Sequence, residues 1–388
     1  MQLDTIASFV AEYISNKQPD EHYHGREDII HQSKLVDMLT GRKPKDDDDP
    51  VLVRGNAFDL ACKLEDYRMF TKTYKASVES APSAAMEKGF AEYLIEKRFK
   101  VDEPYGEQKA RDWMDAKDAD GKFLFWRSST SENARVKKFN EVWPKIKDYV
   151  REQVSLFDVD SKYILSADDL NGVMVAAERA HKLTTEKIQA IKNMYHECVI
   201  LSMVDVKWFW NFESTDANVE FAGELDRLWI IVHREPEDGV IHVRLLSTDY
   251  KYSMYPDWSK AFLSSYNYVQ YITYIDMMEK MLREIQMHYI DQYGNTEEIS
   301  FNVLEADMDY LVGNPNKSET VIPIEVDPQF RLMHHSSMET ASGYIYPSVI
   351  SIVDEYLFRK EKDDWSSPME YLQNGYIKIE INKTYKMI

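Results

Sequence analysis

The feature that most limits how this chain can fold is a pair of apolar segments separated by a short turn. The segments cover residues 228–232 and 240–246, and the turn between them reads Glu235-Pro-Glu-Asp-Gly239. Proline and glycine between two apolar runs are typical of a turn, so the sequence predicts a β-hairpin. If the turn is centred on its middle residue, Asp226 on the first strand lies opposite about Thr248 on the second.

Charged residues stand at the end of this hairpin that is remote from the turn. Asp249 and Lys251 are two positions apart, so on a strand they share one face. Asp226 is expected one position away from Asp249, a difference that a bulge or the details of the turn can absorb. Because unpaired charge is costly beside apolar strands, we expect the three side chains to meet in one patch. A cross-strand ion pair between Asp226 and Lys251 on a solvated face is the alternative.

Two carboxylates and a lysine in one patch predict a site for divalent-metal hydrolysis. Mg²⁺ (or Mn²⁺) prefers oxygen ligands and keeps several waters, so Asp226, Asp249 and a backbone carbonyl suffice to bind it. The metal lowers the pKa of a bound water and stabilises charge on a phosphodiester, and Lys251 can orient the attacking water. Gln270 and Tyr274 follow one helical turn apart, where they are placed to hold a nucleotide or the water.

The remaining pattern predicts an α+β protein whose core is interrupted by a helical insertion. The first 50 residues are expected to be helical, residues 51–80 and 200–388 to form the α+β core, and residues 81–199 to form the insertion. Strands are predicted at 67–74, 204–212, 219–234, 240–249, 299–304, 321–326 and 376–381. Helices are predicted at 84–97, 134–154, 166–195 and 258–289.

The composition limits the classes of protein to which this chain can belong. With 44% hydrophobic and 29% charged residues, the 388-residue chain is expected to be soluble and globular. No membrane span or secretory signal is expected, and two cysteines fit the reducing cytoplasm and are too few for an iron–sulfur cluster. The net charge of -20 argues against non-specific coating of nucleic acid. A nuclease with a local basic channel stays compatible with that charge.

The ordered set of these residues resembles the PD-(D/E)XK nuclease superfamily, particularly its phage and bacterial recombination exonucleases. That family has a glycine-led helix with a ligand four residues on, a strand aspartate, a hairpin, Asp-x-Lys, and then Gln-x-x-x-Tyr. The matching segments are Gly55-Asn-Ala-Phe-Asp59, Asp226, Asp249-Tyr-Lys251, and Gln270 with Tyr274. Residues 64–70 and 82–86 are also similar, and the likeness covers roughly residues 51–100 and 200–380.

The resemblance implies a central mixed sheet flanked by helices and a metal-dependent DNA nuclease, an exonuclease of phage replication or recombination. It implies Mg²⁺ (or Mn²⁺) bound by Asp59, Asp226 and Asp249, and catalysis by Asp226, Asp249, Lys251, Gln270 and Tyr274. The implied partners are DNA and a phage single-strand-annealing or replication protein, in the cytoplasm of a bacterial host, with oligomers possible. The alternatives are an inactive nuclease-fold module for binding or assembly, and an endonuclease or nickase on the same core.

Two positions depart from the family pattern. The family often has histidine where Asp59 stands here, and it normally has threonine after the Asp-x-Lys lysine, where this chain has Tyr252. The basic clusters Lys97-Arg98-Lys100 and Arg135-Lys137-Lys138 lie in the predicted insertion. Because individual Lys and Arg residues make phosphate contacts, we expect the insertion to form one wall of a DNA channel beside Asp226 and Asp249.

Overall fold

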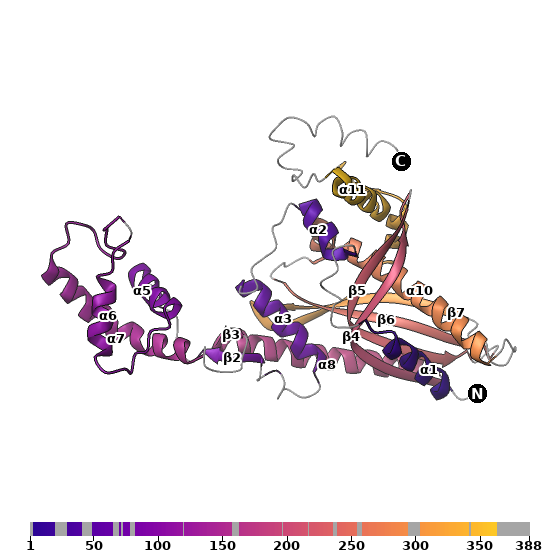
Figure 1. Ribbon diagram of the computed structural model, residues 1–388. Helices are drawn as coiled ribbons and strands as arrows, with labels where there is room; N and C mark the ends of the chain where they lie inside the picture. The colour runs from indigo at the N-terminus through magenta and orange to yellow at the C-terminus, as the bar shows by residue number, and fades with distance from the viewer. Residues whose placement is uncertain are drawn as a thin grey trace. The chain divides into compact units, whose positions relative to one another are not determined.

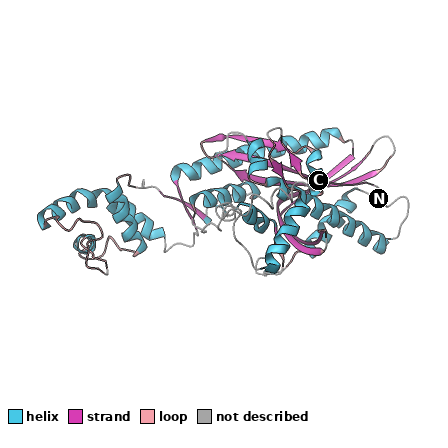
Figure 2. Ribbon diagram, turned by 90° about the horizontal axis from the view of Figure 1, so that it is seen from above, coloured by secondary structure: helices cyan, strands magenta, loops and turns pink. Residues whose placement is uncertain are grey.

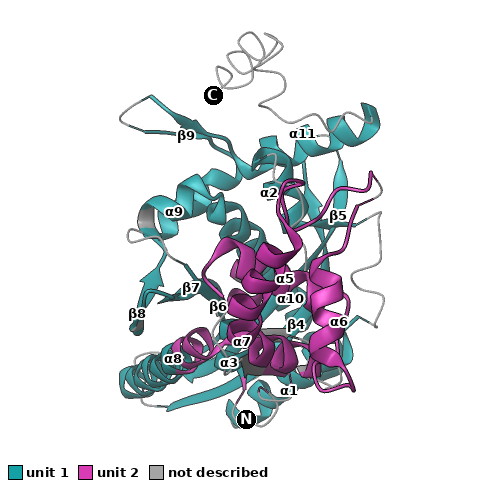
Figure 3. Ribbon diagram, turned by 90° about the vertical axis from the view of Figure 1, so that its left-hand side faces the viewer, with its two compact units in different colours: residues 1–49, 58–63, 175–388 teal, residues 50–57, 64–174 magenta. Residues whose placement is uncertain are grey.

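The computed structural model divides the chain into two compact units. The first unit comprises residues 1–49, 58–63 and 175–388, and the second comprises residues 50–57 and 64–174 (Figure 3). The structure describes residues 3–19, 29–40, 49–64, 70, 73–77, 82–118, 120–156, 163–195, 197–215, 217–235, 239–253, 258–293, 303–340 and 343–362. The strand predicted at 376–381 and most of the one predicted at 67–74 lie outside these residues.

The first unit is built around a mixed sheet (Figure 1). Its six described strands are β1 (Ile30–His31), β4 (Glu197–Glu213), β5 (Asn218–Arg234), β6 (Ile241–Tyr252), β7 (Val303–Asn314) and β8 (Lys317–Glu325). The order is β1-β5-β6-β7-β8, and β4 also pairs with β5. The β4/β5, β5/β6 and β7/β8 pairs are antiparallel, whereas β1/β5 and β6/β7 are parallel.

Helices cover both faces of this sheet (Figure 2). On one face Leu228 and Ile230 of β5 pack into the main core with α10 (Asn267–Tyr293) and α1 (Leu3–Asn16). On the other face Trp229 and Ile231 pack against residues of α8 (Ala167–Met194). The expectation of an α+β fold with a mixed central sheet flanked by helices is therefore confirmed.

Smaller elements complete the first unit. They are α2 (Gln32–Thr40), α9 (Trp258–Ser264), the 3-10 helix η2 (Pro328–His334), α11 (Val349–Lys362), and the short strands β9 (Met338–Glu339) and β10 (Ile345–Tyr346). The single helix predicted at 258–289 is wrong, because the chain breaks it into α9 and α10. Tyr266 between them has a φ of 56°, outside the helical region.

The second unit is mainly helical. It contains α5 (Ala85–Glu96), α6 (Gly106–Met114) and α7 (Glu132–Leu156), and its strands β2 (Tyr74–Ser77) and β3 (Tyr163–Ser166) pair in parallel. Phe90, Leu94, Phe139 and Trp143 lie in its buried core. Two helices belong in part to each unit: α3 (Pro50–Lys63) and α8. Two of the unit boundaries, after residues 57 and 174, therefore fall inside helices, whereas the sequence predicted boundaries near residues 81 and 199.

Candidate functional site

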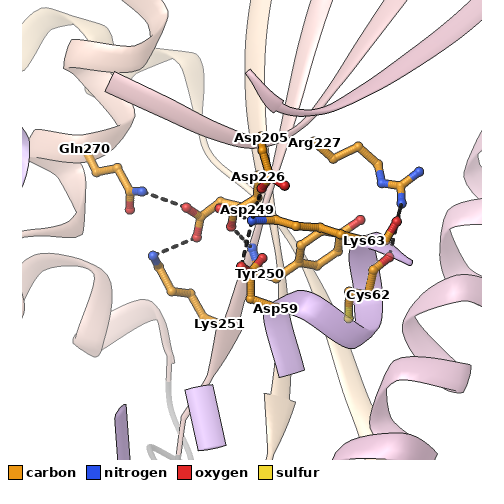
Figure 4. Close-up of polar contacts among 10 residues, drawn as sticks. All are labelled: Asp59, Cys62, Lys63, Asp205, Asp226, Arg227, Asp249, Tyr250, Lys251 and Gln270. Carbon is orange, nitrogen blue, oxygen red and sulfur yellow. Dashed lines mark hydrogen bonds and ion pairs between the residues drawn. The ribbon is translucent and has the colours of Figure 1, made fainter. Parts of the chain in front are cut away.

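The β5/β6 hairpin brings Asp226 and Asp249 together. Its register pairs Arg227 with Thr248, one position from the expected register, so the next residues along the two strands are Asp226 and Asp249. The Tyr250 backbone N–H donates a hydrogen bond of 2.9 Å to Asp226 Oδ2 (Figure 4). This contact fixes the Asp226 carboxylate against β6.

An irregularity in β4 sets the position of Asp226 on β5. Val204 pairs with Arg227 and Val206 pairs with Leu225, and no pair is formed between them. The intervening residue of β4, Asp205, has a φ of 51°, so the strand is distorted at this point although its register with β5 is the same on both sides. Asp205 and Asp226 are therefore released from the regular alternation of the sheet.

Helix α3 supplies two more charged side chains, Asp59 and Lys63, one turn apart. Lys63 Nζ lies 2.6 Å from Asp59 Oδ2, 2.8 Å from Asp205 Oδ1 and 3.2 Å from Asp226 Oδ1. The Arg227 guanidinium donates to the carbonyl oxygens of Cys62 and Lys63, at 3.1 Å each. These bonds satisfy carbonyls at the C-terminal end of α3, where a cation is favourable, and hold this end of the helix to β5.

Asp249 is buried between Lys251 and α10. Gln270 Nε2 donates to Asp249 Oδ1 at 2.6 Å, and Lys251 Nζ lies 2.8 Å from Asp249 Oδ2 (Figure 4). Tyr274 is buried one turn after Gln270 and bonds to Gln270 and to the backbone of Glu224. Gln270 therefore holds the Asp249 carboxylate in this structure, and Tyr274 supports Gln270.

A glycine makes room for Tyr274. A Cβ atom built on Gly223 of β5 would lie 3.0 Å from Tyr274 Cε1 and 3.1 Å from Met277 Sδ. Both distances are shorter than ordinary van der Waals contacts between carbon and its neighbours. The absence of a side chain at this position lets α10 approach the strand that carries Asp226.

The carboxylates of the site repel one another in buried surroundings. Burial, followed by the nearby Asp226 carboxylate, raises the pKa of Asp59 to about 8. Burial raises the pKa of Asp249 to about 6, although Lys251 acts in the opposite direction. Burial alone would lower the pKa of both lysines, but the adjacent carboxylates raise the pKa of Lys63 and of Lys251 above its ordinary value. The two ammonium groups therefore stay charged and offset part of the negative charge of the aspartates.

The donor set fits a divalent cation that prefers oxygen. Asp59, Asp226 and Asp249 offer carboxylate oxygens from a helix and two strands, the ligand type that Mg²⁺ and Mn²⁺ bind. Asp59 Oδ1 is buried and has no hydrogen-bond partner within the described part of the chain. A bound cation would explain why this buried oxygen has no hydrogen bond. Lys63 contacts two of these carboxylates, Asp59 and Asp226, and would compete with the cation.

All six residues proposed from the sequence lie in the first unit. Lys63 and Asp205 were missed, although Lys63 stands four positions after Asp59 on a predicted helix, where two side chains meet. A third missed group consists of His233, Glu235 and His242 at the turn end of the hairpin. The two histidines could have been found from the sequence, because they fall opposite each other when the two predicted strands of the hairpin are paired.

The basic clusters of the second unit are partly neutralised within that unit. Arg135 Nε lies 3.0 Å from Asp115 Oδ1, Lys138 Nζ lies 3.2 Å from Glu141 Oε2, and Lys97 Nζ lies 3.0 Å from Glu96 Oε1. Lys137 is exposed. A DNA channel formed by these residues stays a prediction.

Comparison with known proteins finds no family, no curated protein and no solved structure that matches this chain. Within the described ranges, none of the helices has both the length and the apolar character needed to cross a bilayer.

Proposed function

We propose that the chain is a metal-dependent DNA nuclease of the PD-(D/E)XK type, acting as an exonuclease. The observation that carries the proposal is the convergence of Asp59, Asp226 and Asp249 with Lys251. These charges come from one helix and two strands, and they meet in a place where burial alone would disfavour charge. Perturbed carboxylates beside a buried ammonium are characteristic of catalytic sites.

Asp59, Asp226 and Asp249 would hold Mg²⁺ or Mn²⁺, which supplies Lewis acidity toward water and the phosphodiester. Lys251 keeps its proton because of Asp249 and Asp226, so it acts as a donor that orients water and faces developing negative charge. Gln270 fixes one oxygen of Asp249 and leaves the other to Lys251. Tyr274 positions Gln270 and contributes to catalysis indirectly.

The test is digestion of linear duplex and single-stranded DNA with Mg²⁺ or Mn²⁺. We expect Lys251→Ala to reduce the rate by about 100-fold or more, the effect of losing one charge-stabilising donor. A matched control is Lys280→Ala, because Lys280 is also largely buried and pairs with Asp276 at 2.9 Å in the same unit. Equal rates for Lys251→Ala and the unmodified protein would remove the assigned site.

Two further measurements separate the proposal from its alternatives. Circular DNA should resist digestion if the enzyme needs an end, whereas cleavage of circles would indicate an endonuclease or nickase. Calorimetric titration with Mn²⁺ should show binding that disappears in Asp226→Asn with Asp249→Asn. If the double variant binds Mn²⁺ as the unmodified protein does and no DNA is cleaved, a binding or assembly module is the better description.

A further inference from the structure

The turn end of the β5/β6 hairpin carries a second group of metal-binding side chains. The ligand atoms of His233, Glu235 and His242 all lie within 4.8 Å of one another. His233 and His242 are direct partners in the β5/β6 register, so their side chains share one face of the sheet. His233 is seven positions from Asp226 along β5, roughly 23 Å at the rise of a strand. The group is therefore separate from the carboxylate site.

His233 is the most unusual member of this group, because its side chain is only 1% exposed. Neither of its ring nitrogens has a hydrogen-bond partner among the residues that the structure describes. The nearest carboxylate oxygen, Glu235 Oε1, lies 3.6 Å from its Nδ1 atom. A buried imidazole without hydrogen bonds is unfavourable, and a metal bond to one nitrogen would satisfy it.

Stacked rings fix the orientation of His233. The Tyr195 ring lies 3.6 Å from the His233 ring and the His242 ring lies 4.8 Å from it, measured between centroids. The side chain therefore has little freedom to turn toward another partner. The stack keeps the His233 ring beside His242 before any ion arrives, which reduces the loss of entropy on binding.

His242 has a carboxylate beside it in the position of an outer-shell partner. Glu305 Oε1 of β7 lies 3.5 Å from His242 Nδ1, which has no hydrogen bond within the described residues. Metal-binding histidines commonly direct one ring nitrogen to a carboxylate and the other to the metal. The nearby cation Arg244 pairs with Asp307 at 3.0 Å, so its charge is largely compensated.

We propose that His233, Glu235 and His242 form a zinc site that joins the two strands of the hairpin at its turn. Two imidazole nitrogens and one carboxylate oxygen suit Zn²⁺, whereas Mg²⁺ prefers an all-oxygen set. The Glu235 side chain is 35% exposed, which leaves a path for the ion and for a water in the remaining position. Bound Zn²⁺ would stabilise the two strands whose far ends carry Asp226 and Asp249.

The test is calorimetric titration of the full chain with Zn²⁺ in a background of Asp226→Asn and Asp249→Asn, which removes the carboxylate site. We expect one bound Zn²⁺, and an affinity at least about tenfold weaker after Glu235→Gln or His242→Gln. His288→Gln is the matched control, since His288 is exposed on α10 and its ring contacts only the aromatic rings of Phe9 and Tyr13 among the described residues. Glu235→Gln is the milder change because Glu235 is partly exposed.

Thermal unfolding supplies a second readout that does not depend on nuclease activity. Zn²⁺ should raise the Tm of the background protein and of the His288→Gln control, but not of the two ligand variants. The same concentration of Mg²⁺ should leave all four proteins unchanged. Zn²⁺ affinity in either ligand variant equal to that of the control would overturn the three-ligand site, as would absence of Zn²⁺ binding to the background protein. If the double variant does not fold, one of the Zn²⁺ ions bound by the unmodified chain should bind at least about tenfold more weakly after Glu235→Gln, and unchanged Zn²⁺ affinities overturn the site.

Discussion

Lys63 Nζ lies 3.2 Å from Asp226 Oδ1 and so places a positive charge among the proposed metal ligands. The substitution Lys63→Met should destabilise the metal-free protein by about 3 kcal/mol, because the neighbouring carboxylates lose their counter-charge. The same change should increase the rise in Tm caused by Mn²⁺, since the competing ammonium is gone. Thermal unfolding with and without Mn²⁺ measures both effects. Lys182→Met, which removes an exposed lysine of α8, should change neither.

Tyr252 stacks on Phe58, the neighbour of Asp59, with ring centroids 5.0 Å apart. Threonine, which the PD-(D/E)XK pattern normally has after the lysine, would therefore weaken the packing of α3 against β6 and is not expected to improve the site. We expect Tyr252→Thr to weaken Mn²⁺ binding and to reduce stability by about 1–3 kcal/mol, whereas Tyr252→Phe keeps the stack and both properties. Tighter Mn²⁺ binding by Tyr252→Thr would show that the stack has no such role.

Gly223→Ala should push Tyr274 away from β5, because the added Cβ meets Tyr274 Cε1 at 3.0 Å. We expect a loss of about 1–3 kcal/mol in urea unfolding, typical of overpacking, and lower nuclease activity. Gly55→Ala is the comparison, since nothing lies within 4 Å of a Cβ there and Gly55 is inside α3. That variant should be as stable or slightly more stable. A neutral Gly223→Ala would contradict the packing argument.

Mn²⁺ binding should strengthen as the pH rises. Burial and Asp226 raise the pKa of Asp59 to about 8, and burial raises that of Asp249 to about 6. Below these values the carboxyl groups hold protons that the metal must displace, so affinity should increase by up to about tenfold per pH unit between pH 6 and 8. Calorimetry in buffers of different ionisation enthalpy measures the released protons. Asp59→Asn should flatten the dependence, and an affinity independent of pH would refute the assignment.

Lys137→Glu together with Lys138→Glu should weaken DNA binding and lower its salt slope by about two. Both lysines are accessible on α7, whereas Arg135 is mostly buried beside Asp115 and is best left in place to preserve the fold. Mn²⁺ affinity should be unaffected. Lys88→Glu with Lys109→Glu makes the same charge change on α5 and α6. If both pairs weaken binding equally, net charge rather than a channel explains the effect.

The architecture follows closely from local pattern. Val206, Trp208, Trp210 and Phe212 alternate along the sequence, and all four are buried on one face of β4. Strand periodicity and a turn rich in proline and glycine therefore suffice to predict the hairpin and its neighbours. The break at Tyr266 was not predictable, because neither proline nor glycine marks it.

Only part of the candidate site could be predicted from the sequence. Asp226, Asp249 and Lys251 follow from the hairpin, since their approach depends on two adjacent strands. Asp59 was proposed from the family resemblance alone, and Asp205 depends on a positive φ that aspartate tolerates but does not require. Contacts between elements far apart in sequence are set by the packing of the whole core, which local periodicity does not encode.

The boundary inside α3 has a practical consequence for dissecting the protein. Only residues 58–63 of this helix belong to the first unit, and the chain then enters the second unit before returning at Val175. A fragment that starts at Val175 would retain Asp226 and Asp249 but lack Asp59 and Lys63. Residues 1–49 belong to the same unit and place α1 in its core, so a fragment that restores the first unit must supply residues 1–63 as well as the segment from Val175 onward.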